Sequence, residues 1–166
     1  MAGTNGADHV PGSSRAGALP DARRSMTATI LIGIGIMAAV DEIIFHQVLA
    51  WHHFFDRSTP AIGLLSDGLL HSAELIISVA GFFMFANLHR RHALAPQPAW
   101  AGFFLGLGGF QLLDGLVSHK LLRIHQIRYV ENILPYDLAW NVFALVLLAV
   151  GTILAVRSRR SQTRAG

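Results

Sequence analysis

The sequence of 166 residues contains no cysteine, and only 14% of its residues are charged. The absence of cysteine excludes disulfide bonds and thiolate metal sites. The low charge, together with 52% hydrophobic residues, excludes an ordinary soluble domain, and the length allows one compact domain. The net charge of +3 comes from arginines near the ends and in one connection, so it indicates membrane orientation rather than nucleic-acid binding.

Long apolar segments are abundant instead. Four of them reach the roughly 20 residues that a helix needs to cross a bilayer. They predict an all-α, integral membrane four-helix bundle over residues 26–156, with helices at about 26–50, 62–88, 98–120 and 133–156. Residues 1–25 are rich in glycine, alanine, serine and arginine and are predicted to form a disordered cytoplasmic tail. They contain no apolar run, so a cleaved signal peptide is not expected. Residues 157–166 are predicted to form a basic cytoplasmic tail.

The distribution of lysine and arginine predicts an orientation. Nine of these residues precede the first helix, join the second to the third, or follow the fourth, and four lie in the other two connections. Positive residues favour the cytoplasm, so we expect both termini to be cytoplasmic in a cell inner membrane. The expected partner is the lipid bilayer, and the sequence predicts no oligomeric state.

One polar pattern occurs in two of the apolar segments: an aspartate, a histidine five residues later and a second histidine six residues after that. Its members are Asp41, His46, His52, Asp114, His119 and His125. The two copies are 73 positions apart, and Gly33 and Gly35 recur at the same offset as Gly106 and Gly108. We predict two tandem helical hairpins related by an internal pseudo-twofold axis along the membrane normal.

Ionisable side chains inside a membrane are costly and indicate function. Those of the four segments are predicted to lie near the extracytoplasmic face, where both halves would line one shared cavity. The candidate metal ligands are Asp41, His46, His52, Asp67, His71, Asp114, His119, His125 and Asp137. Glu42 and Glu74 are the candidate proton acceptors. An ideal α-helix would place His46 about 140° from Asp41, so either two polar edges line the cavity or the helix is distorted near its end.

The mixture of imidazoles and carboxylates suits zinc, iron, manganese or copper(II). It favours a membrane metalloenzyme, an oxidoreductase or hydrolase acting on a small or lipid-soluble substrate. The alternatives are a non-enzymatic metal-binding or metal-delivery protein of the cell envelope, a haem protein using facing histidines, an ion pathway, and a structural polar network. Confinement of the polar residues to one leaflet argues against a complete pathway.

Three segments also resemble a known bacterial family, namely residues 40–53, 66–71 and 113–128. The patterns HQ-x3-WHH and DG-x3-H are the most specific parts of a resemblance that covers about residues 30–156. The family is called domain of unknown function 2243 and comprises predicted small membrane proteins of four helices. The resemblance implies a four-helix inner-membrane protein without implying an activity. Glu42 stands where the family pattern is expected to have glycine, which adds a carboxylate beside the site.

Overall fold

The computed structural model describes residues 19–165, which are helical apart from their connections. The helices, in chain order, are α1 (Ala22–Asp41), η1 (Glu42–Val48), α2 (Pro60–Arg90), α3 (Pro96–Leu113), η2 (Asp114–Leu121) and α4 (Leu134–Ala165). The π-helical segments η1 and η2 continue α1 and α3 without a break, so the chain forms four long helical spans. Each span is long and apolar enough to cross a bilayer. The prediction of an all-α protein with four membrane-spanning helices is thus confirmed.

Two helix ends lie more than two residues beyond their predicted limits. The first helix begins at Ala22, because the Asp21 carboxylate accepts a hydrogen bond of 2.9 Å from the backbone N–H of Arg24 and caps it. The last helix continues to Ala165, so most of the predicted basic tail is helical. Residues 1–18 of the predicted disordered tail lie outside the described residues.

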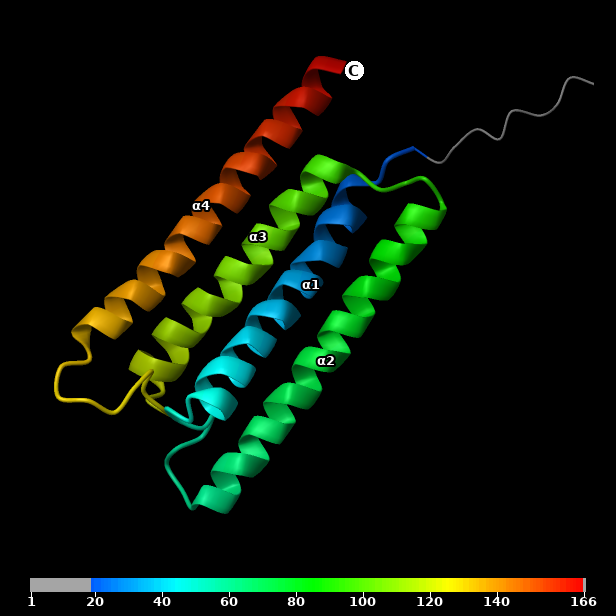
Figure 1. The fold of residues 1–166 in the computed structure, drawn as a ribbon. Coiled ribbons are helices and arrows are strands. Elements are labelled where there is room, and N and C mark those ends of the chain that lie inside the picture. The colour runs from blue at the N-terminus through cyan, green and yellow to red at the C-terminus, as the bar shows by residue number, and fades with distance from the viewer. Residues whose placement is uncertain (1–18, 166) are drawn as a thin grey trace, which may run out of the picture.

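The four helices stand in a row in the order α2, α1, α3, α4 (Figure 1). Packing contacts join α1 to α3, and each of these central helices also packs against one outer helix. Most side chains of α2 and α4 are exposed, as expected for helices that face lipid. Along the helix axes, the start of α1, the α2–α3 connection and the end of α4 lie at one end of the bundle. The opposite end carries η1, η2 and the other two connections, and we call it the η end.

The central helices approach each other closely at Gly33 and Gly106. A Cβ atom added to Gly33 would collide with the carbonyl oxygen of Phe103, and one added to Gly106 would collide with the carbonyl oxygen of Ile30. Both obstacles are backbone atoms, so no side-chain movement can relieve the collision. The two collisions are also reciprocal, because Ile30 and Phe103 are 73 positions apart, as the two glycines are. This close approach allows the polar groups at the η ends of α1 and α3 to meet.

Candidate metal centre

Both central helices change from α to π geometry at the aspartate of the polar pattern, since η1 follows Asp41 and η2 begins at Asp114. A π-helix is hydrogen-bonded from residue i to residue i+5, so residues five apart lie on the same face. His46 Nε2 consequently lies 3.7 Å from Asp41 Oδ2, and His119 Nε2 lies 3.1 Å from Asp114 Oδ2. The helix is distorted near its end, which removes the angular conflict expected for an ideal α-helix.

A left-handed residue follows each π segment. Ala50 has φ 47° and Arg123 has φ 52°, values that non-glycine residues adopt at a cost. The two residues are 73 positions apart, so the chain turns in the same way after both segments. Each turn directs the following loop back over the η end, where the third member of the pattern lies.

The two loops are hydrogen-bonded to each other through these third members. His52 Nδ1 lies 3.0 Å from the carbonyl oxygen of Ile127, and a neutral ring donates its Nδ1–H there. His125 Nδ1 lies 2.8 Å from the carbonyl oxygen of Phe54 in the same way. The two bonds are reciprocal, because residues 54 and 127 are also 73 positions apart. Each bond orients one imidazole and leaves its Nε2 facing the interior.

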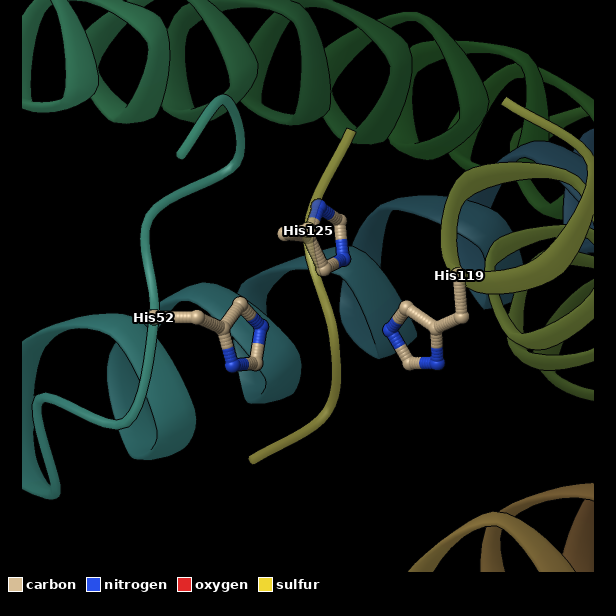
Figure 2. A group of neighbouring side chains, drawn as sticks. All are labelled: His52, His119 and His125. Carbon is tan, nitrogen blue, oxygen red and sulfur yellow. The ribbon is translucent and has the colours of Figure 1, made fainter. Parts of the chain in front are cut away.

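Six side chains thereby form one buried cluster, which we call the central cluster. Its members are Asp41, His46, His52, Asp114, His119 and His125, and each exposes no more than 4% of its surface. The rings of His52 and His125 stack with centroids 4.6 Å apart, and the His119 ring lies 4.7 Å from that of His125. Candidate ligand atoms of these three histidines all lie within 4.8 Å of one another. In Figure 2 His52 and His125 enter from the two loops and His119 from the helical end.

A second group adjoins the cluster on the α2 side. His46 Nδ1 lies 3.2 Å from Asp67 Oδ1 and 2.7 Å from Glu42 Oε2. The Asp67 carboxylate also accepts the backbone N–H of Phe54 at 2.7 Å and contacts His53 Nδ1 at 2.6 Å. His53 is a site residue that the repeated pattern does not include. Its position directly after His52, beside a carboxylate-bearing helix, was the available signal.

The remaining predicted residues lie away from the central cluster. The His71 side chain is 56% exposed, and its Nδ1 lies 2.5 Å from Glu74 Oε1. Asp137, near the start of α4, forms an ion pair with Lys120. These residues are held apart because α2 and α4 occupy the edges of a row instead of surrounding a common axis.

A family described as predicted membrane proteins, DUF2243, matches residues 28–158. The chain belongs to this family. The match covers all four spans, which confirms the resemblance expected from the sequence. No curated protein and no solved structure matches the chain.

The DUF2243 description gives a membrane location, so the chemistry of the site must be inferred from its atoms. The Nε2 atoms of His46, His52, His119 and His125 are all buried without a hydrogen-bond partner. The Asp114 oxygen 3.1 Å from His119 lies at ion-pair distance, but its direction does not fit a hydrogen bond. Because unsatisfied buried polar groups are costly, four of them in one place require an explanation.

The protonation state of one ring in this DUF2243 chain fits ligation. Burial, with the neighbouring imidazoles of His125 and His46, lowers the pKa of His52 to about 2. The ring is therefore neutral at physiological pH, which is the form that binds metals. With its Nδ1–H donated to a carbonyl oxygen, the Nε2 lone pair points into the cluster.

Proposed function

We propose that this DUF2243 protein is an integral membrane metalloprotein whose central cluster binds a divalent transition metal. The proposed ligands are Nε2 atoms of His52, His119 and His125, with Asp41 and Asp114 beside them. The observation that carries the proposal is the convergence of buried Nε2 atoms without hydrogen-bond partners, with the rings of His52 and His125 oriented by Nδ1–H bonds to carbonyl oxygens. Imidazole ligation of this kind, with the ring fixed by an outer hydrogen bond, is typical of metal sites. Imidazoles with carboxylates suit zinc, iron, manganese or copper(II).

The alternatives explain less of the geometry. A purely structural polar network would satisfy its own donors and acceptors. Here the inward-facing nitrogens make no hydrogen bond, although those of His46, His119 and His125 lie 3.1–3.7 Å from carboxylate oxygens. Haem ligation would need a porphyrin between two facing histidines. The rings of His46 and His52 lie 4.4 Å apart and those of His52 and His125 lie 4.6 Å apart, so neither of these pairs leaves space for a macrocycle.

A catalytic role is the leading form of this proposal. A bound metal would supply Lewis-acid or redox chemistry, and three imidazole ligands would leave a coordination position for a substrate. Glu42, buried beside His46, is the nearest candidate proton acceptor outside the cluster. Glu74 is also buried, but it is engaged by His71 on the α2 side.

A hollow of about 360 Å³ between α1 and α4 offers a route for a lipid-soluble substrate. Its wall includes Phe45 and Trp140, and the Trp140 ring lies 5.7 Å from the His119 ring.

The second candidate function is a non-enzymatic metal-binding or metal-delivery protein of the cell envelope, favoured by the nearly complete burial of the cluster. Addition of a small exogenous ligand such as azide distinguishes the two functions. A change in the spectrum of the bound metal would show an open coordination position, which the enzyme requires.

The full-length protein, produced without a histidine tag in metal-replete medium, is expected to purify with about one equivalent or more of tightly held transition metal. The reason is that three converging imidazoles, two of them held by hydrogen bonds to carbonyl oxygens, supply the protein ligands of one open site. Elemental analysis after gel filtration in detergent measures the content. A folded protein without stoichiometric metal would refute the proposal, and a Soret band in the visible spectrum would replace it by the haem alternative.

We further propose that the two hairpins are a tandem repeat and that the η end faces the extracytoplasmic side. The reciprocal glycine contacts, the paired left-handed residues and the reciprocal loop bonds, all at an offset of 73, support the repeat. The excess of arginine around the opposite end supports the orientation.

The absence of cysteine makes the orientation directly testable. Ser58→Cys, in the exposed α1–α2 connection, is expected to react with a membrane-impermeant maleimide on spheroplasts. Ser161→Cys, exposed near the end of α4, is expected to react only after the membrane is permeabilised. The unmodified chain provides a background without thiols, and the reverse labelling pattern would contradict the proposed orientation.

A further inference from the structure

The two halves of the chain differ where the first half adjoins α2. Positions of α1 and η1 correspond to those of α3 and η2 at an offset of 73, and positions of α2 correspond to those of α4 at an offset of 70. The pairs that differ at this place include Glu42 and Gly115, Gln47 and Lys120, His71 and Asn141, and Glu74 and Ala144. Asp67 and Asp137 correspond and are both aspartates. The first half therefore has additional carboxylates, whereas the second half has an ammonium group.

Glu42, His46 and Asp67 place three buried candidate ligand atoms around one point. Their ligand atoms lie within 4.8 Å of one another, and the three residues expose 1–3% of their surfaces. His46 presents Nδ1 to this group, while its Nε2 faces Asp41 in the central cluster. One imidazole thus lies between two groups of carboxylates.

Outer partners hold the two carboxylates in this arrangement. Gln47 Nε2 donates to Glu42 Oε1 at 2.8 Å, and the backbone N–H of Phe54 donates to Asp67 Oδ1 at 2.7 Å. The other Glu42 oxygen, Oε2, is fully buried and has no hydrogen-bond partner, although it lies 2.7 Å from His46 Nδ1. Among the described residues, no lysine or arginine pairs with Glu42 or Asp67. Their charged partners are the imidazole of His46 and, for Asp67, also that of His53.

A hollow of about 400 Å³ leads to this group from the side. Glu42 and Asp67 form part of its wall, together with Gln47 and His71. Gly68, which also lines it, has open space where a side chain would lie. An ion can therefore reach the two carboxylates without passing through the central cluster.

The corresponding place in the second half is filled by the protein itself. The ammonium group of Lys120 donates a hydrogen bond to the carboxylate of Asp137, the counterpart of Asp67. Gly115, the counterpart of Glu42, packs under Trp140, and a Cβ atom there would lie 2.7 Å from the indole. The second half thus has a lysine ammonium group at the position where the first half has only carboxylates and imidazoles.

We propose that Glu42, His46 and Asp67 form a second divalent-cation site, separate from the central cluster and exchanging its ion through the lateral hollow. Two oxygen donors and one nitrogen suit a harder ion such as Mn²⁺ or Fe²⁺ better than the histidine-rich cluster does. The site shares only His46 with the central cluster. Cation binding at this site can therefore be tested independently of metal binding by the central cluster. The ligands of the second site are specific to the first half.

A titration of the full-length, untagged, chelator-treated protein in detergent with Mn²⁺ tests the proposal, with free Mn²⁺ followed by its electron paramagnetic resonance signal. Glu42→Gln and Asp67→Asn are isosteric and keep the acceptors for Gln47 and Phe54, so the local fold is retained. Each is expected to weaken one Mn²⁺ site at least about tenfold. Asp137→Asn is the matched control, because the corresponding carboxylate is already paired with Lys120, and it is expected to leave Mn²⁺ affinity unchanged.

His125→Asn separates the two sites. It removes an Nε2 atom from the central cluster and leaves Glu42, His46 and Asp67 unaltered, so the Mn²⁺ site is expected to persist. Wild-type Mn²⁺ affinity in both Glu42→Gln and Asp67→Asn would overturn the proposal. Equal weakening in Asp137→Asn would also overturn it by revealing a general charge effect, and loss of Mn²⁺ binding in His125→Asn would assign the ion to the central cluster instead.

Discussion

His125→Asn is expected to abolish stoichiometric binding of the tightly held metal while preserving the fold. Asparagine keeps an N–H donor where His125 Nδ1 donates to the carbonyl oxygen of Phe54, and it removes the Nε2 atom that faces the cluster. We expect the affinity to fall at least about 100-fold, since even loss of a group that orients a ligand costs 10–100-fold. Competition against a chromogenic chelator measures the change.

Two comparisons make this result interpretable. His89→Ala removes an exposed histidine beside Arg90, at the end of the bundle opposite the η end. This variant should bind metal as the wild-type protein does. His125→Ala removes the donor as well as Nε2, so it should additionally lower thermal stability. Wild-type affinity in a monodisperse, helical His125→Asn protein would exclude His125 as a ligand.

Gly33→Ala is expected to destabilise the protein by about 1–3 kcal/mol, the usual effect of overpacking a tight interface. The new methyl group would collide with the carbonyl oxygen of Phe103, so α1 and α3 would have to separate along their whole contact. A separation there would also draw apart the two halves of the central cluster. The loss should appear as a lower midpoint of thermal unfolding in detergent and as weaker metal binding.

Gly109→Ala is the matched control, because a Cβ atom at Gly109 has no neighbour within 4 Å. Alanine is a better helix former than glycine by about 0.5–1 kcal/mol, so this variant should be as stable as the wild type or slightly more stable. Equal stability of Gly33→Ala and Gly109→Ala would show that the close approach of α1 and α3 does not limit stability.

The spans and the repeated pattern could be predicted from the sequence because both depend on local composition. A stretch of about 20 apolar residues can satisfy its backbone in a bilayer only as a helix, or as part of a closed barrel, whatever surrounds it. The family resemblance added the same architecture, and the match to residues 28–158 bears it out. The sequence also indicated the six residues that the structure gathers, because polar groups placed twice in one register are hard to explain as surface.

Which of the predicted site residues meet in space could not be predicted from the sequence. Which helices are neighbours depends on contacts between distant parts of the chain, and a row places His71 and Asp137 far from the centre although both share the apolar setting of the ligands. The π geometry of η1 and η2 was likewise one of two open possibilities, since an Asp-x4-His spacing suits a π turn only if the tertiary structure requires the histidine on that face. His53 was missed because its role depends on Asp67, 14 positions away in the chain.

The hydrogen bonds between the two loops set the order in which the protein can mature. The first hairpin leaves the ribosome first, and until the second hairpin arrives His52 has no Ile127 carbonyl to orient it, while Asp41 and His46 have no α3 to shield them from lipid. Half of the central cluster is then exposed as polar side chains within the bilayer. The metal proposed for the central cluster could be held only after both hairpins have been inserted and joined, so its acquisition would mark the completion of biogenesis.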